Sequence, residues 1–323
     1  MKNPARRNFA HLPTQVEHLE RLSGYLGGPS IYVKRDDQTG LALGGNKTRK
    51  LEFLVADAME KRCKTLVSAG ALQSNHCRQT AAAAAKFGLG CILVLNGEPG
   101  MAATGNYLLD RLFGAETVIV REREDRARVL DEVYAKAEKE GKKPYLVPYG
   151  GSSPVGALGY AFAVREFLEQ WLKTDYMVFG SSSGGTHAGL VLGQRLFGYN
   201  GTILGISIDE SADSLKNKVA VLASEASELL GSRINFAPEE INADDSYCKA
   251  GYGVLTDEER EAIKLFAEYE GLLLDPIYTG RAAAGLVDLI KKGRFKKSDT
   301  LLFWNTGGQP ALFAEAYEKH LLY

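Results

Sequence analysis

Short apolar runs alternate with segments of helical periodicity along the first half of the chain. The apolar runs predict strands, and the segments between them, one of which is rich in alanine, predict helices. The strands are expected at residues 65–68, 91–95, 117–120 and 144–148, and the helices at residues 73–87, 104–113 and 123–140. Strands that are apolar throughout and joined by helices are typical of a parallel sheet covered on both faces.

A second series of the same kind follows the segment Gly150–Pro154. Its strands are expected at residues 176–179, 202–208, 272–274 and 301–304, and its helices at residues 185–196, 214–230, 257–269 and 281–292. Thr256 and Glu259 form a capping-box signature at the start of the third of these helices. Residues 235–253 are irregular and predict a loop, whose length indicates a function. With 323 residues, the chain is therefore expected to form two α/β units.

The composition is that of an ordinary globular protein, with 24% charged residues, 45% hydrophobic residues and a net charge of −1. No basic stretch contains interleaved aromatic residues, and no apolar run is long enough to span a bilayer. Neither nucleic acid nor a membrane is therefore an expected partner. Residues 1–13 lack the apolar core of a signal peptide. The four cysteines have neither zinc-type spacing nor a C-x-x-C motif, so we expect no metal site, no redox role and a cytoplasmic location.

A lysine stands in an unusual setting in the segment Gly44–Lys47, which follows the apolar run Ile31–Asp37. The two glycines allow the backbone to fold closely around a bound group. Lys47 could then act as an amine nucleophile, the chemistry by which lysines form Schiff bases with aldehydes such as pyridoxal phosphate. A solvated surface lysine is the alternative. A nucleotide phosphate loop is disfavoured, because Asn46 breaks the G-x-x-x-x-G-K-[ST] register that begins at Gly40.

The segment Gly180–Gly189 is rich in glycine and serine and lies between a predicted strand and a predicted helix. The N–H groups and the dipole at a helix N-terminus form an anion site, and glycines allow a ligand to approach closely. The segment lacks the G-x-G-x-x-G spacing, so an isolated phosphate is favoured over a dinucleotide, and an oxidoreductase is disfavoured. A flexible strand–helix turn is the alternative.

Four hydrogen-bonding side chains share one predicted helix start: Gln73, Ser74, Asn75 and His76. N-capping by Ser74 explains one of them, whereas a binding site for an α-carboxylate explains all four. The loops Asp275–Arg281 and Trp304–Pro310 also follow predicted strands. Because ligands collect at the carboxyl ends of strands in open α/β sheets, we expect these loops to converge on one crevice.

Taken in order, these motifs resemble those of the tryptophan-synthase-β-like, fold-type-II pyridoxal-phosphate enzymes. The matching segments are Lys34–Asp37, Gly44–Lys50, Gln73–Gln79, Ser183–Gly189, Asp275–Gly280 and Thr306–Gly308. More narrowly, the chain is similar over nearly its whole length to the branch that contains D-cysteine desulfhydrase, L-cysteate sulfo-lyase and 1-aminocyclopropane-1-carboxylate deaminase. The resemblance implies a homodimer with an α/β fold of two open, mostly parallel three-layer α/β/α domains. These are a large cofactor-binding domain of residues 1–50 and 160–323 and a small mobile domain of residues 51–159.

The resemblance also implies roles for single residues, with pyridoxal 5'-phosphate as the cofactor. Lys47 would hold the cofactor as a Schiff base and move the substrate's α-proton, with Ser74 and Tyr278 as the other catalytic residues. Asn75 would bind the cofactor's phenolic oxygen, and Thr306 would lie near its pyridine nitrogen. The cofactor's phosphate would be bound by Lys50, Ser183, Gly184, Gly185 and Thr186. The amino-acid substrate would be bound by Ser74, Asn75, His76, Tyr252 and Tyr278.

The expected reaction is a β-elimination that releases pyruvate and ammonia, because the cofactor withdraws electrons and a lysine can then remove the α-proton. Where the deaminases of this branch carry a glutamate and a leucine, this chain has Thr279 and Thr306. Two threonines make a weaker electron sink than a carboxylate on the ring nitrogen, which favours substrates with a good leaving group. Cysteine, with D-cysteine first, is therefore the expected substrate, and hydrogen sulfide the third product. The alternatives are L-cysteate with loss of sulfite, deamination of aminocyclopropane carboxylate, and a relative that binds the cofactor without turnover.

Overall fold

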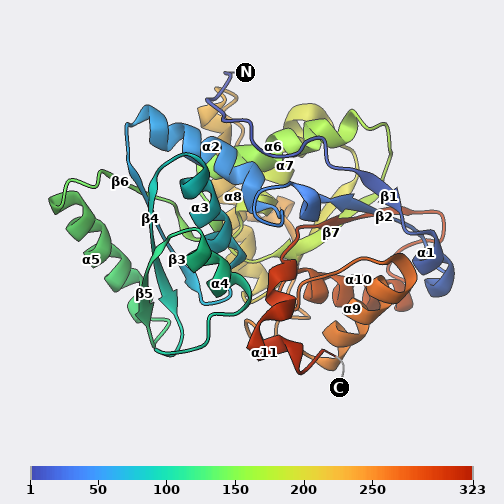
Figure 1. The fold of residues 1–323 in the computed structure, drawn as a ribbon. Coiled ribbons are helices and arrows are strands. Elements are labelled where there is room, and N and C mark those ends of the chain that lie inside the picture. The colour runs from blue at the N-terminus through green and yellow to red at the C-terminus, as the bar shows by residue number, and fades with distance from the viewer. Residues whose placement is uncertain (1, 322–323) are drawn as a thin grey trace.

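The structure, a computed structural model, describes residues 2–321 and contains two sheets (Figure 1). The strands of the larger sheet are Val16–His18 (β1), Ser30–Arg35 (β2), Tyr176–Ser181 (β7), Thr202–Ser207 (β8), Asn242–Asp244 (β9) and Thr300–Asn305 (β10). Those of the smaller sheet are Thr65–Ala71 (β3), Gly90–Asn96 (β4), Glu116–Val120 (β5) and Pro144–Leu146 (β6). The strand orders are β1-β2-β10-β7-β8-β9 and β5-β4-β3-β6. Every pair is parallel except β1 with β2.

Helices connect the strands, as parallel pairing requires. Those that precede residue 150 are Glu20–Leu26 (α1), Lys47–Glu60 (α2), Asn75–Lys86 (α3), Gly105–Leu112 (α4) and Asp125–Lys139 (α5). Those that follow are Pro154–Leu168 (α6), Gly185–Phe197 (α7), Ala212–Leu229 (α8), Asp257–Glu270 (α9), Thr279–Lys291 (α10) and Glu315–Glu318 (α11). No helix among residues 2–321 is long and apolar enough to cross a membrane.

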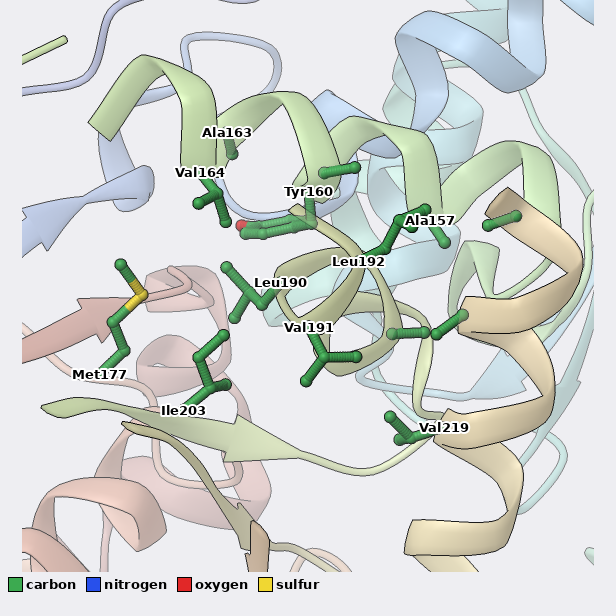
Figure 2. Packing of buried hydrophobic residues seen from close by; sticks show 14 of the residues in the cluster. Ala157, Tyr160, Ala163, Val164, Met177, Leu190, Val191, Leu192, Ile203 and Val219 are labelled. Carbon is green, nitrogen blue, oxygen red and sulfur yellow. The ribbon is translucent and has the colours of Figure 1, made fainter. Parts of the chain in front are cut away.

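The larger sheet is the middle of three layers. Successive side chains of a strand point to opposite faces, and in β7 Met177 and Phe179 pack with α6, α7 and α8, whereas Val178 packs with α1, α9 and α10. Figure 2 shows part of the first layer, in which Met177 and Ile203 of the sheet face Leu190 of α7. The sheet is therefore covered by helices on both faces.

The smaller sheet has the same construction. Leu66 and Leu93 pack against α2 and α3 on one face. Val67 and Ile92, their neighbours in sequence, pack against Ala137 of α5 on the other. Figure 1 shows α5 and α3 on opposite sides of this sheet. The expected three-layer α/β/α arrangement is thus confirmed for both sheets.

Two helices, α2 and α6, pack against each other where the sheets meet. Phe53 of α2 belongs to the apolar cluster of the larger sheet, and its neighbour Leu54 to that of the smaller one. The expected domain boundaries, 50/51 and 159/160, fall inside these two helices. The division into a large domain and a small mobile domain stays a prediction.

The pattern of elements differs from the sequence-based expectation in one misassigned strand, one loop that contains a strand, and several elements that were not predicted. The predicted strand at residues 272–274 is wrong: Leu272 and Leu274 are buried in the layer of α9 and α10, but the segment joins neither sheet. Residues 235–253 are not entirely a loop, because they contain β9, which pairs with β8. Strands β1 and β2 and helices α1, α2, α6 and α11 were not predicted, whereas every predicted helix forms with its ends within two residues of the expected ones. The capping box of Thr256 and Glu259 is also present.

Candidate active site

The expected crevice lies where the carboxyl ends of β3, β7 and β10 meet the start of α2. One cavity is lined by residues from all of these elements: Asn46, Lys47, Ser74, Asn75, His76, Tyr149, Gly150, Gly180, Ser181, Ser182, Ser183, Gly184, Thr186, Tyr278, Thr306 and Gly307. Loops that are far apart in the sequence therefore form one site, as expected for ligand sites in parallel α/β sheets.

Lys47 is the first residue of α2, and its side chain faces this cavity. Its Nζ donates to Oδ1 of Asn46 at 2.9 Å and lies 5.9 Å from the ring centroid of Tyr278. Burial lowers the pKa of the amine to about 8; the carboxylate of Asp275 opposes this shift, and the charge of Arg78 adds to it. At pH 7 roughly a tenth of such an amine is neutral. Lys47 thus has the neutral amine that a nucleophile or a general base requires.

The glycines before Lys47 are required by the close packing of this loop. Gly44 has a φ of 67°, and a Cβ there would overlap the carbonyl oxygen of Asp37. The carbonyl oxygen of Gly44 accepts hydrogen bonds from Arg78 Nη2, at 2.8 Å, and from Gln79 Nε2. The loop that carries Lys47 is therefore fixed to helix α3.

The expected phosphate site is the start of α7. Gly184 is the N-cap residue, with a φ of 82° and no side-chain cap. Ser183 and Thr186 line the cavity, and Thr186 Oγ1 accepts from Asn46 Nδ2 at 3.0 Å. Gly185 N–H is already bound, because it donates to Ser152 Oγ at 3.1 Å. The uncapped first turn of this 13-residue helix is suited to an anion.

Lys50, the other expected phosphate ligand, does not line the cavity. It is buried behind the cavity wall, where Nζ donates to the carbonyl oxygen of Gly150 at 3.1 Å. Burial, together with the charge of Lys47, lowers its pKa well below the usual lysine value. Its direct contact with a phosphate stays a prediction.

Ser74, Asn75 and His76 lie together at the start of α3 and line the cavity, as expected. Ser74 also caps the helix, because its Oγ accepts from Cys77 N–H at 3.2 Å. Its hydroxyl proton is thus available to a ligand. Gln73 has a different role: its side chain binds Thr104 and Asn106 and holds the start of α4.

The imidazole of His76 is neutral, because burial and the charges of Lys47 and Lys50 lower its pKa well below the usual value. Ser68 Oγ lies 2.8 Å from His76 Nε2 and donates to the carbonyl oxygen of Val147 at 2.8 Å. Since that hydroxyl proton is used, His76 Nε2 must be the protonated nitrogen, and Nδ1 carries a lone pair. An anionic ligand could therefore accept a hydrogen bond from the backbone N–H of His76 but not from Nδ1.

Tyr278 lines the cavity, and Tyr252 stands behind it, outside the lining residues. Their hydroxyl oxygens are 2.7 Å apart. Burial raises the pKa of both phenols well above the usual value; Tyr252 adds to the shift of Tyr278, whereas the hydrogen bond with Tyr278 lowers the pKa of Tyr252 and only partly offsets its burial. Both therefore stay protonated at neutral pH. Tyr252 also borders a neighbouring cavity of about 240 Å³.

Thr306 lines the cavity, but Thr279 does not. Thr279 is buried at the start of α10, where its Oγ1 donates to Asp275 Oδ1 at 2.8 Å. Asp275 also accepts from the backbone N–H groups of Ile277, Tyr278 and Thr279. Among the described residues, no aspartate or glutamate lines the cavity.

Comparison with known proteins identifies the family to which this site belongs. Residues 8–307 match the family described as pyridoxal-phosphate dependent enzyme. The chain belongs to this family. It is also similar to a solved structure described as an ACC deaminase homologue, with 38% identity, a TM-score of 0.91, and coverage of 99% of this chain and 96% of that one.

Two more distant structures share this fold despite little sequence similarity. The processed form of threonine deaminase isoform 2 from Solanum lycopersicum has 18% identity and a TM-score of 0.65, covering 91% of this chain and 79% of that one. A pyridoxal 5'-phosphate-dependent aspartate racemase has 15% identity and a TM-score of 0.66, covering 91% and 90%. The expected fold-type-II architecture is confirmed.

The cavity fits the cofactor of this pyridoxal-phosphate dependent enzyme. It offers a nucleophilic amine at Lys47 and an uncapped helix start behind Gly184. Asn46 contacts both groups, since its amide binds Lys47 Nζ and Thr186 Oγ1. An aldehyde and a phosphate on one small molecule can therefore be bound at the two ends of one cavity.

Three contributors to this site were missed by sequence reasoning. Asn46 was treated only as an interruption of a phosphate-loop register, yet its amide binds both Lys47 and Thr186, a residue of the expected phosphate site. Tyr149 lines the cavity, and Ser152 binds Ser183 Oγ at 2.8 Å and Gly185 N–H. Tyr149 and Ser152 flank Gly150-Gly151, and this glycine pair after a predicted strand was the available signal.

Proposed function

We propose that this pyridoxal-phosphate dependent enzyme is a lyase that catalyses β-elimination from cysteine, with D-cysteine as the preferred substrate. The products are hydrogen sulfide, pyruvate and ammonia. The observation that supports this proposal is the lack of a carboxylate among the described residues that line the cavity. Thr306, a neutral hydroxyl, takes the place of an acidic partner for the ring nitrogen, and the buried Asp275 is bound to its own backbone turn.

Bound pyridoxal phosphate supplies an electron-withdrawing ring that acidifies the α-carbon of the amino acid joined to it. Without an acidic partner the ring is a weaker electron sink. Reactions in which a good leaving group departs at once are then favoured over those that need a long-lived carbanion. Thiolate is such a leaving group.

The chain's own residues supply the proton transfers and the orientation. Lys47 Nζ accepts the α-proton, because its lowered pKa of about 8 leaves part of the amine neutral. Ser74 Oγ and the first N–H groups of α3 bind the substrate carboxylate, since an anion is stabilised at a helix N-terminus. Tyr278 stays protonated and donates to the departing sulfur, and the hydroxyl of Tyr252 orients it.

A sulfonate leaving group is the second candidate, because two arginines lie near the aromatic residues of the site. The guanidinium of Arg126 lies 4.7 Å from the ring centroid of Tyr149, and that of Arg123 lies 5.9 Å from the ring centroid of Tyr252. Arg123 is paired with Asp209 at 3.4 Å, whereas Arg126 donates to the neutral Oδ1 of Asn96. The positive charge of Arg126 favours a substrate with a second negative group, such as L-cysteate. The similarity to an ACC deaminase homologue keeps aminocyclopropane carboxylate as a third candidate.

One comparison of rates tests these candidates. Pyruvate is measured with D-cysteine, L-cysteine and L-cysteate, and 2-oxobutyrate with aminocyclopropane carboxylate, and the kcat/KM values are compared. We expect the highest value for D-cysteine. A kcat/KM for aminocyclopropane carboxylate that equals or exceeds that for D-cysteine contradicts the elimination proposal. A higher kcat/KM for L-cysteate than for D-cysteine makes L-cysteate the preferred substrate. A cofactor-loaded protein that gives no product with any of the four is a binding relative without turnover.

The assembly and motion of the protein follow from the family resemblance. We propose a homodimer in which residues 51–159 form a small domain that moves relative to the rest when substrate binds. Light scattering measures the mass of the particle, and small-angle scattering with and without substrate measures the motion. A monomeric mass contradicts the first part, and an unchanged radius of gyration contradicts the second.

A further inference from the structure

The amide of Asn75, which lines the cavity, is held from behind by two buried residues. Its Oδ1 accepts one hydrogen bond from Arg78 Nη1 at 3.0 Å and a second from Asn106 Nδ2 at 2.9 Å. Arg78 lies one turn further along α3, and Asn106 lies at the start of α4. Neither lines the cavity, and both are fully buried.

Arg78 determines which end of the Asn75 amide faces the ligand. A guanidinium has donors only, so the atom of Asn75 against it must be the carbonyl oxygen. Arg78 Nη1 also donates to Asn106 Oδ1 at 2.7 Å, which leaves Asn106 Nδ2 as the donor to Asn75. Both amides are thus oriented by the same cation, and a flipped Asn75 would place its NH₂ group against a guanidinium.

The free end of Asn75 is therefore Nδ2. Within residues 2–321 no protein acceptor binds this nitrogen. A Cβ on Gly308 would lie 2.6 Å from it, so the glycine leaves Nδ2 uncovered on that side. An uncommitted donor that points from a fixed amide is suited to an oxygen acceptor on a bound molecule.

Arg78 and Asn106 are themselves held in place by further hydrogen bonds. Arg78 Nη2 donates to the carbonyl oxygen of Gly44, in the loop that carries Lys47. Asn106 donates through Nδ2 to the carbonyl oxygen of Gln73 at 2.9 Å, and Gln73 Oε1 accepts from Asn106 N–H at 2.8 Å. Burial lowers the pKa of Arg78 to about 10, so it remains a cation at neutral pH.

We propose that Arg78 and Asn106 are positioning residues that hold Asn75 with Nδ2 toward the cavity, where it donates to the phenolic oxygen of pyridoxal phosphate. This inference rests on the proposed cofactor contact of Asn75. It adds two residues that never touch the cofactor and that determine the direction of this hydrogen bond. It also connects α4 to the cofactor site through one shared guanidinium.

The test is a double-mutant cycle on cofactor binding to the cofactor-free protein. The dissociation constant of pyridoxal phosphate is measured for Asn75→Ala, Arg78→Met and the double variant. We expect each single variant to weaken binding about tenfold, and the double variant to be no weaker than the weaker single one, because Arg78 acts through Asn75. The pH midpoint of the bound cofactor's visible absorbance should shift in the same direction in both single variants. Arg78→Lys, which retains donors only, should recover part of the affinity.

Gln79→Met is the matched control, because Gln79 also donates to the carbonyl oxygen of Gly44 but does not contact Asn75. Its effect should add to that of Asn75→Ala. If Arg78→Met does not fold, the cycle is run with Asn106→Ala, which removes the other hydrogen bond to Asn75 Oδ1.

Additive losses for Asn75 and Arg78 would overturn the proposal, since Arg78 would then act independently. Unchanged affinity in Asn75→Ala would overturn it as well, because Asn75 would not bind the cofactor. Neither result bears on the lyase assignment, which depends on the products formed by the wild-type enzyme.

Discussion

Two kinds of buried cation lie close together in this fold. One kind, Arg49, is paired with carboxylates, and the other, Arg78 and Lys47, is not. Arg49, on the first turn of α2, forms ion pairs of 2.8 Å with both Asp36 and Glu166. Arg78, near the start of α3, donates to neutral oxygens, and Lys47 donates to the amide oxygen of Asn46; neither forms an ion pair within residues 2–321. Paired charges stabilise the scaffold, whereas unpaired charges remain available for chemistry.

The pKa values follow this division. Burial alone would lower the pKa of Arg49, but Asp36 and Glu166 raise it well above the usual value. For Arg78 burial prevails, and its pKa falls to about 10; for Lys47 it falls to about 8. Asp275 opposes the fall for both groups, and Asp110 opposes it for Arg78, but among residues 2–321 neither cation forms an ion pair with a carboxylate. The positive charge that remains on this side of the site suits a phosphate and an amino-acid carboxylate.

The largest effect is expected from the cation that carries the chemistry. Lys47→Ala should lower pyruvate formation by at least roughly 1,000-fold, because the general base is lost, while cofactor binding persists more weakly. Borohydride reduction of the loaded wild-type enzyme followed by peptide mapping should place the pyridoxyl group on Lys47. A label on Lys50 or Lys34 would contradict the assignment.

Removing the paired cation should affect the fold instead. Arg49→Met leaves the buried Asp36 and the partly buried Glu166 without their arginine, so we expect a loss of about 3–5 kcal/mol in the free energy of unfolding. Urea denaturation of the cofactor-free protein measures it. Arg128→Met is the control, since Arg128 pairs with Asp125 and Glu132 on an exposed helix and should leave stability unchanged. If Arg49→Met loses no more free energy of unfolding than Arg128→Met, the distinction between paired and unpaired buried cations is wrong.

A matched pair of variants distinguishes loss of the anion site from general destabilisation of helix α7. Gly184 and Gly198 flank α7 with φ values of 82° and 76°. Replacement of either by valine forces a side chain into the left-handed region and should destabilise the protein similarly. Only Gly184→Val should weaken binding of pyridoxal phosphate, by at least roughly tenfold, because only that end faces the cavity. Equal affinities in the two variants would exclude the start of α7 as the phosphate site.

The smallest effect is expected from the electrostatic coupling between the two unpaired cations, Lys47 and Arg78. The rate at which pyridoxal phosphate attaches to the cofactor-free protein should rise with pH and level off above about 8, where the Lys47 amine is neutral. Because the charge of Arg78 helps to lower that pKa, Arg78→Met should move the midpoint to higher pH. Stopped-flow absorbance measures this rate. A midpoint that stays in place or moves down would show that the two cations are not coupled.

Features encoded by neighbouring residues were predictable from the sequence. Strands buried on both faces are apolar throughout, so β3, β4 and β7 were recognised, together with the glycine loops that follow strands. Helix α6 was missed, because it is buried on nearly all sides and shows no polar face, although Ser153-Pro154 is a standard start signal. The triplet 272–274 was misread for the same reason, since an apolar run alone does not distinguish a strand from a buried connection.

Features that depend on contacts between distant segments were not predictable in this way. Thr279 was expected beside the cofactor ring, but it forms part of the Asp275 turn and does not line the cavity. Asn106 lies 31 residues from Asn75, and Ser152 lies 31 residues from Ser183. No local motif marks Asn106, and the Gly150-Gly151 pair next to Ser152 does not reveal its partner, because only the fold brings each residue beside the one it binds.

The strand order has a consequence for the synthesis of the protein. β2 lies between β1 and β10, yet β10 begins only at Thr300. At ribosomal speeds of about 5–20 residues per second, the edge of β2 that pairs with β10 stays unpaired for roughly 15–50 s. Thr306 and Gly307, which complete the cofactor cavity, emerge later still. A nascent chain therefore exposes one unpaired edge of β2 until residues 300–305 have been made, and a chain truncated before β10 retains an open edge that favours aggregation.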